Sequence, residues 1–254
     1  MLSEKIIVVT GGAGLLGRNF CKAIASQGGI VIVADNNIKN AELVASEIQS
    51  TGGKAEARML DVTSTPSVES LVNSLHTQFG RIDAVVNNAY PRNKNYGRKL
   101  EEVTYLDFCE NVNLHLGGYF LVAQQFALYF RKQGCGNIIN LSSIYGSMVP
   151  RFEVYEGTPM TMPVEYAAIK SSINHLSRYF AQYFKTDGIR CNTLSPSGIF
   201  DNQPESFLKK YNNHCGIKGM LDAEDIVGSL IYLLSDASRY VTGHNLIVDD
   251  GYCL

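Results

Sequence analysis

The chain has 254 residues, of which 45% are hydrophobic and 18% are charged, and its formal net charge is −2. This balance gives no overall field that would attract nucleic acid or an acidic membrane, and no apolar run approaches the ~20 residues needed to cross a bilayer. The six cysteines lack metal-ligand spacing, which predicts reduced thiols and no metal site. Because the N-terminus has no signal-peptide pattern, we expect a cytoplasmic protein.

Short β-branched runs alternate with helix-length segments along the whole chain. The predicted strands cover residues 6–10, 30–34, 55–60, 84–87, 137–141, 189–194 and 246–248. The predicted helices cover residues 14–27, 39–51, 65–79, 101–132, 164–186 and 222–235. Most strand runs are almost continuously apolar, as in a parallel sheet covered on both faces. The alternation predicts right-handed βαβ units and one doubly wound α/β domain over residues 1–254.

Two long irregular segments, residues 144–163 and 196–221, interrupt this alternation. Each follows a predicted strand, so each leaves the carboxyl edge of the sheet, where ligands bind in this architecture. Long loops in compact domains are usually functional. We therefore expect both segments to border a binding site.

A glycine-rich turn follows the first predicted strand, with the sequence Thr-Gly-Gly-Ala-Gly-Leu-Leu-Gly over residues 10–17. Three glycines permit a tight turn, close approach of a pyrophosphate and packing of the next helix on the sheet. The start of that helix offers N–H donors to phosphates. The context, strand before and helix after, favours a dinucleotide site over a plain turn. The candidate cofactor contacts are Gly11, Gly14, Leu15, Leu16 and Gly17.

The ends of the next strands supply further candidate cofactor contacts. Asp35, at the end of the second strand, can accept hydrogen bonds from ribose hydroxyls and would repel a 2′-phosphate. No arginine or lysine lies in the glycine turn, which also favours NAD over NADP. The third and fourth strands end beside residues that could border the adenosine half of the cofactor: Asp61, Val62, Asn88 and Ala89. Residues 1–100 are thus predicted to be mainly the cofactor-binding half.

Tyr166 and Lys170 are four residues apart in a predicted helix, so they share one face of it. An ammonium beside a phenol favours the phenolate, and this lowers the pKa of the tyrosine toward the range of an acid/base catalyst. The pair alone is weak evidence, because Tyr and Lys meet at this spacing on many helices by chance. It gains weight from the dinucleotide turn, which would supply the hydride carrier.

In this set of ordered motifs the chain resembles the short-chain dehydrogenase/reductase family, in its short single-domain branch. The motifs are Thr10–Gly17, Asp61, Asn87-Asn88-Ala89, Asn113, Ser142-Ser143, Tyr166-x-x-x-Lys170, Asn192 to Pro196, and Thr242-Gly243. The resemblance implies a single-domain Rossmann fold whose seven-stranded parallel sheet has the order 3-2-1-4-5-6-7. It also implies an NAD(P)-dependent oxidoreductase, with NAD preferred, that interconverts a secondary alcohol and a ketone.

The resemblance assigns roles in the half formed by residues 101–254. Tyr166 would be the general acid/base, and Lys170 would lower its pKa and bind the nicotinamide ribose. Ser143 would stabilise the charge that develops on the substrate oxygen. Asn113 would hold a relay water beneath Lys170.

The chain departs from the family pattern at several places. The glycine spacing resembles that of an extended branch, and Tyr90 replaces the usual glycine after Asn87-Asn88-Ala89. The interval from Ser143 to Tyr166 is longer than usual by about ten residues. No threonine follows Ile199 at the usual spacing, so backbone groups near Pro196, Gly198 and Ile199 would have to contact the nicotinamide carboxamide.

The long interval before Tyr166 resembles a subgroup linked to bacterial surface-sugar and flagellin-modification pathways. Residues 92–99 carry four cations, which could steer a phosphate or carboxylate, although a solvated loop is an equal alternative. We predict a sugar phosphate or nucleotide sugar as substrate. The candidate substrate contacts are Arg92, Ser143, Tyr145, Arg151, Tyr155 and Tyr166.

Two further questions stay open at the level of sequence. The predicted helices 101–132 and 164–186 carry more aromatic residues than one face needs, which favours a homodimer or homotetramer over a monomer with a fully packed core. Two other functions compete with a dehydrogenase: a sugar epimerase or dehydratase that uses tightly held NAD with no net redox change, and a non-enzymatic dinucleotide-binding protein.

Overall fold

A computed structural model describes all residues, 1–254. Its centre is one seven-stranded sheet in the order β3-β2-β1-β4-β5-β6-β7, and every neighbouring pair is parallel. The predicted strand order is confirmed. The strands are β1 (Ile6–Thr10), β2 (Ile30–Asp35), β3 (Lys54–Met59), β4 (Ala84–Asn87), β5 (Gly136–Leu141), β6 (Ile189–Pro196) and β7 (Asn245–Val248).

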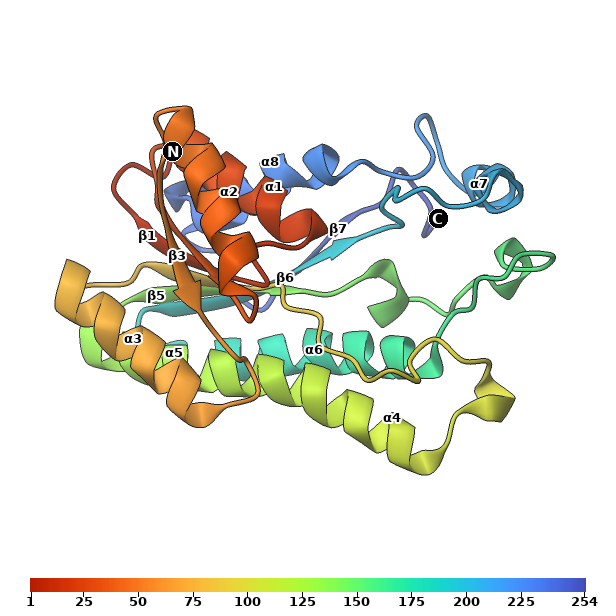
Figure 1. Cartoon of the computed structure of the whole chain (residues 1–254), viewed down its shortest axis with the longest axis horizontal. Coiled ribbons are helices and arrows are strands. Elements are labelled where there is room, and N and C mark those ends of the chain that lie inside the picture. Colours follow the sequence, from red (N-terminus) through yellow and green to blue (C-terminus); the bar gives the residue numbers. More distant parts are fainter.

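Helices cover both faces of this sheet (Figure 1). On one face lie α1 (Leu15–Ser26), α2 (Ile38–Ser50) and α8 (Val227–Leu234), and on the other lie α3 (Thr65–Phe79), α5 (Gly118–Gln133) and α6 (Val164–Tyr183). Each face buries its own large apolar cluster against the strands. The central strands are buried along their whole length because both faces are covered, which explains their continuous apolar runs.

The helix boundaries follow local capping signals. The side chain of Asn37 caps α2 by accepting a hydrogen bond from the backbone N–H of Asn40, and Ser64 caps α3 in the same way. Gly134 ends α5 with a left-handed backbone conformation, which a glycine adopts without steric cost. The predicted bounds of the first three helices lie within one residue of the observed ones.

The predicted helix over residues 101–132 has an internal irregularity. It begins as α4 (Tyr105–Val112), continues through a π-helical turn, η2 (Asn113–Gly117), and then becomes α5. The residues that face the protein interior repeat mainly at intervals of four: Asp107, Asn111, His115 and Tyr119. π-helical turns inside α-helices occur frequently at functional sites.

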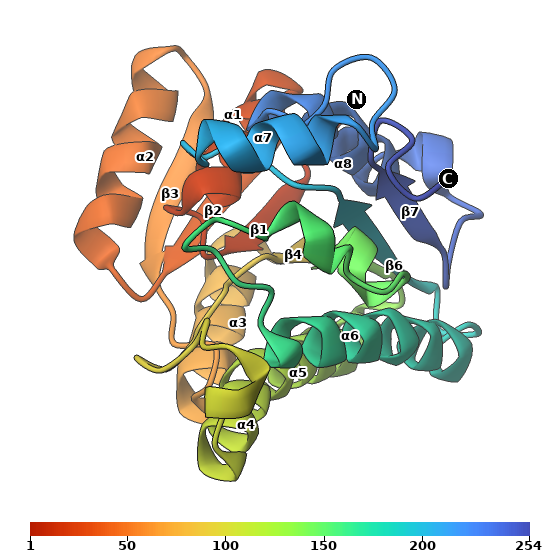
Figure 2. The same cartoon turned by 90° about the vertical axis from the view of Figure 1, so that its right-hand side faces the viewer.

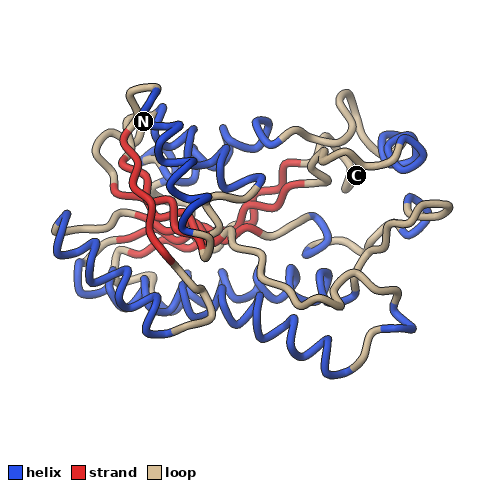
Figure 3. Tube along the Cα trace, viewed as in Figure 1, coloured by secondary structure: helices blue, strands red, loops and turns tan.

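The long segments that were predicted as irregular contain short helices. Residues 144–163 include the 3₁₀ turns η3 (Ile144–Gly146) and η4 (Phe152–Val154), and residues 196–221 include α7 (Glu205–Asn212), which the sequence analysis missed. Figure 3 shows them among the loops beyond the sheet. They pack on one another through a separate apolar cluster formed by Ile144, Tyr145, Val154, Phe207, Tyr211, Met220 and Tyr252. The other short helices are the 3₁₀ turns η1 (Leu100–Glu102), η5 (Ala223–Ile226) and η6 (Asp236–Ser238). None of the helices has both the length and the apolar character of a membrane span.

Candidate active site

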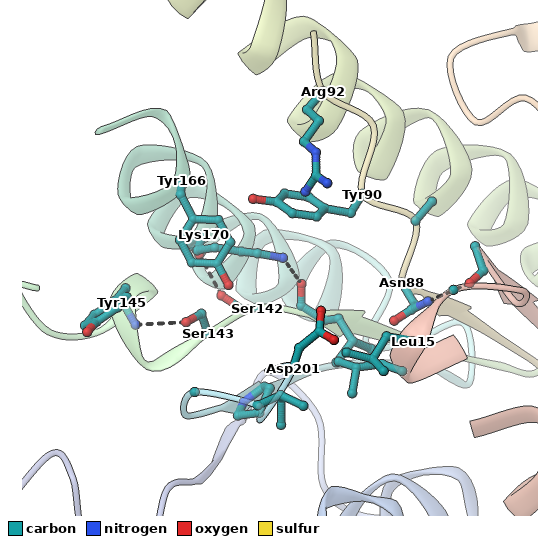
Figure 4. Close-up of a pocket in the computed structure, with 18 of the residues that line it drawn as sticks. Leu15, Asn88, Tyr90, Arg92, Ser142, Ser143, Tyr145, Tyr166, Lys170 and Asp201 are labelled. Carbon is teal, nitrogen blue, oxygen red and sulfur yellow. Dashed lines mark hydrogen bonds between the residues drawn. The ribbon is translucent and has the colours of Figure 1, made fainter. Parts of the chain in front are cut away.

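A cavity of about 890 Å³ lies at the carboxyl edge of the sheet. Figure 2 views the molecule from the side on which α7 and the start of α6 lie. The cavity is lined by residues of the glycine turn, by residues that follow β2, β3, β4, β5 and β6, and by α6. Its size is in the range of ligand sites, and it brings together groups from both halves of the chain. In Figure 4, Leu15 and Asn88 lie on one side of it, and Tyr166, Lys170 and Ser143 on the other.

The glycine turn has the close packing expected of a phosphate-binding turn. Gly11 has a φ of +60°, and a Cβ atom there would lie 2.8 Å from the Cα of Ala89. A Cβ at Gly17 would lie 2.1 Å from the carbonyl oxygen of Gly11. Gly14, Leu15 and Leu16 line the cavity, whereas Gly17 is buried beneath the turn. Glycines therefore keep the backbone free to approach a ligand at the start of α1.

Thr10 and Asn88 hold this turn to the end of β4. The Asn88 side-chain amide donates to the carbonyl oxygens of Thr10 and Gly11 at 3.0 and 3.1 Å. The hydroxyl of Thr10 accepts the backbone N–H groups of Asn88 and Ala89 at 3.0 and 3.1 Å. Asn88 and Ala89 line the cavity. The Asn-Asn-Ala motif thus acts first as a clamp on the glycine turn.

Two of the predicted acidic contacts also line the cavity. The carboxylate of Asp35 accepts the N–H of Ala13 at 3.1 Å and that of Asn37 at 3.0 Å, which fixes it beside the glycine turn. The carboxylate of Asp61 accepts the backbone N–H and the hydroxyl of Thr63, and Val62 is buried next to it. Both carboxylates keep free lone pairs for a ligand.

Tyr166 and Lys170 lie on one face of α6, as predicted, but their electrostatics differ from the prediction. The Lys170 ammonium nitrogen donates to the carbonyl oxygen of Leu141 at 2.8 Å and lies 5.5 Å from the centre of the Tyr166 ring. Burial lowers the pKa of Lys170 to about 7. Burial also raises the pKa of Tyr166, while hydrogen bonding by Ser143 opposes that rise. The expected fall in the pKa of Tyr166 is therefore wrong for this structure, because loss of hydration outweighs the hydrogen bond with Ser143.

Ser142 and Ser143 connect the end of β5 to this pair. The hydroxyl of Ser142 donates to the backbone carbonyl of Lys170 at 2.9 Å, which ties β5 to α6. The hydroxyl of Ser143 accepts the N–H of Tyr145 at 3.2 Å and faces the cavity (Figure 4). Ser143 can therefore contact a substrate oxygen together with Tyr166.

The structure corrects the assignment of Asn113. Its side chain is exposed and lines a separate surface hollow between α4 and α6, rather than the cavity. Residues 111 and 115 face inward. Asn113 is two positions from each of them, so its side chain points to the opposite side of the helix. Asn113 therefore cannot hold a water beneath Lys170. His115 occupies the buried face at this level of the helix.

Three aromatic rings surround the Lys170 ammonium: those of Tyr166, Tyr90 and Tyr119. Of these, only Tyr166 was assigned a role from the sequence. The nitrogen lies 5.8 Å from the ring centre of Tyr90 and 5.4 Å from that of Tyr119. The Tyr90 ring meets the Tyr166 ring edge to face at 5.9 Å. The only sequence signal was Tyr90 itself, which stands where a glycine was expected.

The far end of the cavity is lined by the two long segments. The hydroxyl of Tyr155 donates to that of Tyr145 at 3.3 Å, and the pKa of Tyr155 is raised to about 12, mainly by burial. The apolar lining there comes from residues that sequence analysis did not identify: Met160, Met162, Phe207, Tyr211 and Met220. Because these residues come from separate segments of the chain, no local sequence motif predicts that they line the cavity together.

The two arginines predicted to bind substrate have different positions. Arg92 lines the cavity, and its guanidinium lies 4.8 Å from the ring centre of Tyr90 (Figure 4). Arg151 does not line the cavity; it points toward Tyr252, donating to that residue's carbonyl oxygen at 3.4 Å. Its predicted substrate contact is therefore not supported. Of the basic segment 92–99, only Arg92 and Tyr96 reach the cavity.

The segment after β6 closes the cavity beside the glycine turn. Pro196, Gly198 and Ile199 line it together with Asp201 and Gln203. The N–H of Gly198 donates to the hydroxyl of Tyr211 on α7 at 2.6 Å, and Ile199 forms a bridge with Leu221. The backbone near Ile199 is thus held by α7, without the threonine that is usual at this place.

Comparisons with known proteins agree with this geometry. The family profile described as enoyl-(acyl carrier protein) reductase matches residues 12–253. The chain is 45% identical over 256 aligned residues to post-translational flagellin modification protein A of Campylobacter coli, with both chains covered completely. It is 28% identical to a 7α-hydroxysteroid dehydrogenase of Bacteroides fragilis, over 98% of this chain and 94% of the relative.

A solved structure adds the fold to this evidence. A short-chain dehydrogenase from Leptospira borgpetersenii, with bound NAD⁺, superposes with a TM-score of 0.85 at 30% identity and covers 100% of this chain and 94% of its own. The matches span the sheet, the glycine turn and the Tyr166–Lys170 helix alike. The chain therefore belongs to the short-chain dehydrogenase/reductase family of oxidoreductases, which bind a nicotinamide dinucleotide.

Proposed function

We propose that this protein is an NAD-dependent oxidoreductase that interconverts a secondary alcohol and a ketone, and that its substrate is a sugar phosphate or nucleotide sugar. The observation that carries the proposal is one cavity with a glycine turn at one end and Ser143, Tyr166 and Lys170 at the other. A hydride carrier and a proton-transfer group can therefore meet at one carbon–oxygen bond.

The cavity fits a dinucleotide at its glycine end. Gly11 and Gly14 line the cavity without side chains, and the start of α1 offers N–H groups to a pyrophosphate. Asp35 would accept the ribose hydroxyls and repel a 2′-phosphate, which supports NAD rather than NADP. The bound cofactor supplies hydride transfer. The segment from Pro196 to Ile199 also borders the cavity.

The protein groups then account for the proton. In the direction of oxidation, the phenolate form of Tyr166 takes the proton of the substrate hydroxyl as the hydride leaves the carbon, and in reduction the neutral phenol returns the proton to the oxygen. Ser143 stabilises the charge on that oxygen by hydrogen bonding. Lys170 would bind the nicotinamide ribose, and its positive charge would favour the phenolate form of Tyr166.

Three features support a sugar derivative. The cavity presents the hydroxyls of Tyr145 and Tyr155, which can bond sugar hydroxyls. Arg92 reaches the cavity without an ion-pair partner in the chain, so its guanidinium is available to a phosphate. The 45% identical relative is named for flagellin modification. These features together favour a role in the biosynthesis of surface carbohydrate.

The test is a screen of sugar phosphates and nucleotide sugars with NAD⁺ and NADH, followed by absorbance of the reduced nicotinamide. Oxidation or reduction of a member of this set is expected, and Tyr166→Phe should lower turnover by about 10²- to 10⁴-fold while it leaves NADH binding intact. Turnover retained in Tyr166→Phe would refute the catalytic assignment. Product formation without net NADH would instead indicate an epimerase or dehydratase. NADH binding with no turnover of any substrate would indicate a binding protein.

We also propose that the protein forms a homodimer or homotetramer through α4, α5 and α6. A surface hollow on this side is lined mainly by apolar groups, among them Phe108, Val112, Leu116, Phe120 and Leu176. Phe120 and Tyr179 are exposed there, which is unfavourable for an isolated chain. Light scattering after size exclusion should give a multiple of 27.9 kDa. Phe120→Glu should dissociate the assembly, whereas Tyr240→Glu, at another exposed tyrosine, should not; a monomeric wild-type protein would refute the proposal.

A further inference from the structure

His115 is a fully buried polar side chain close to the proton-transfer pair, and the proposed mechanism does not use it. It lies in the π-helical turn η2 and is only 1% exposed. Neither of its ring nitrogens has a hydrogen-bond partner within the protein. An unpartnered buried polar group costs about 1–3 kcal/mol, so its presence calls for a physical explanation.

The surroundings of His115 are those of Lys170. The His115 ring meets the Tyr90 ring at 4.9 Å and the Tyr119 ring at 5.1 Å, in both cases edge to face. The Lys170 ammonium lies 5.8 and 5.4 Å from the centres of the same two rings. The imidazole and the ammonium therefore share two aromatic neighbours, Tyr90 and Tyr119.

The charge state of His115 suits an acceptor. Burial holds its pKa well below the ordinary value, and the positive charges of Lys170 and Arg92 lower it further. A neutral imidazole has one nitrogen that donates and one that accepts. Lys170 has three N–H donors, and the structure gives its nitrogen one acceptor in the protein, the carbonyl oxygen of Leu141. A free acceptor and free donors therefore lie near the same two aromatic rings.

We propose that His115 is a positioning residue for Lys170: its neutral imidazole accepts a hydrogen bond from the Lys170 ammonium, directly or through one water, and so holds the ammonium beside Tyr166. The side chain thus performs, from the inward face of the helix, the support that sequence analysis assigned to the outward-facing Asn113. The catalytic consequence rests on the proposed function, but the contact between His115 and Lys170 does not.

The contact can be tested without a substrate. In protein labelled with ¹⁵N-histidine and saturated with NADH, the His115 signals are those that disappear in His115→Asn. Lys170→Met should move the signal of the unprotonated His115 nitrogen to the position of a free, neutral imidazole. Tyr166→Phe, which keeps the ammonium, should leave it in place. A His115 signal that is the same in wild type and Lys170→Met would overturn the proposal.

The catalytic consequence is tested with any substrate that the screen finds. His115→Phe keeps a ring in the site and removes the acceptor; it should lower kcat about tenfold or more, shift the pH profile of kcat, and change the Kd for NADH less than about twofold. His115→Asn restores an acceptor and should recover most of the turnover and the wild-type pH profile. His244→Phe, at an exposed histidine, is the matched control and should change neither.

The outcomes of the two tests separate the proposals. Wild-type kcat and pH profile in His115→Phe would overturn the positioning role. If His115→Phe does not fold, the nitrogen signal in Lys170→Met still decides it. If the screen finds no substrate, the proposed function fails there, while the nitrogen signal continues to test the contact between His115 and Lys170.

Discussion

The ammonium nitrogen of Lys170 lies 5.8 Å from the centre of the Tyr90 ring, although the two residues are 80 positions apart and a glycine was expected at position 90. The same ring contacts Tyr166, His115 and the guanidinium of Arg92. Tyr90 therefore connects the proton-transfer pair to the residues at the substrate end. A cation over an aromatic face in a site with little water is stabilised by about 2 kcal/mol.

Replacement of Tyr90 should therefore affect turnover through the loss of its ring. Tyr90→Leu removes the aromatic face beside Lys170 and is expected to lower kcat by roughly 10- to 30-fold, the equivalent of one desolvated cation–π contact. Tyr90→Phe keeps the ring and loses only the hydrogen bond to the Tyr96 hydroxyl. It should stay within about threefold of wild type in steady-state assays. Equal kcat in Tyr90→Leu and wild type would show that the ring does not support catalysis.

Asp35 should set the choice between the two dinucleotides. Asp35→Ser removes a carboxylate that is fixed beside the glycine turn. We expect NADH to bind about tenfold more weakly and NADPH about tenfold more tightly, because one charge repulsion and one charge-assisted bond are lost. Fluorescence titration with each dinucleotide measures the ratio. Asp61→Asn, at a carboxylate engaged by Thr63, is the control and should leave the ratio unchanged.

Gly17 should tolerate no side chain. A Cβ there would lie 2.1 Å from the carbonyl oxygen of Gly11, so Gly17→Ala must move the glycine turn or the start of α1. We expect the variant to lose dinucleotide binding, measured by titration calorimetry. We also expect a clear fall in Tm, measured by differential scanning calorimetry. Gly228→Ala, in α8, meets no atom within 4 Å and should be neutral or stabilise the fold by up to about 1 kcal/mol. Normal dinucleotide binding by Gly17→Ala would contradict the packing argument.

Lys170 should reduce the stability of the folded protein at neutral pH. Its pKa is lowered to about 7 in the folded state, below the value of ~10.4 in an unfolded chain. The unfolded state therefore binds more protons between these values, and wild-type stability falls as the pH drops from about 10 to 7. Lys170→Met should raise Tm by about 2–5 °C at pH 7 and by less at pH 10, while turnover is lost. A difference in Tm that does not vary with pH would contradict the lowered pKa.

The sheet was predictable from the sequence because its signal is local and repeated. Strands covered on both faces must be apolar along their whole length, and β1 and β4 were predicted at their observed bounds. The glycine turn was predictable for a similar reason. Gly11 and Gly17 occupy positions where a Cβ would collide with the backbone, and such positions are visible in sequence as glycines at fixed spacing.

The substrate end was much less predictable. Helix α7 lies in a segment that has no regular apolar pattern in the sequence, and it is held by Tyr211, whose hydroxyl binds the backbone of Gly198. Arg151 was expected in the cavity but contacts Tyr252, near the C-terminus. Both placements come from packing between segments more than ten residues apart. No local sequence motif predicts such packing.

The sequence by itself determined the alternation of strands and helices, the glycine turn and the pairing of Tyr166 with Lys170, since each depends on spacing within one element or on alternation of elements. Only the tertiary structure decided which residue of the long helix lies on its buried face near Lys170. The choice between Asn113 and His115 depends on which face of that helix packs on the sheet, and the π-helical turn alters that relationship locally. A shift of two residues reverses the direction of a side chain, so the motif placed the support on the correct helix but on its outer face.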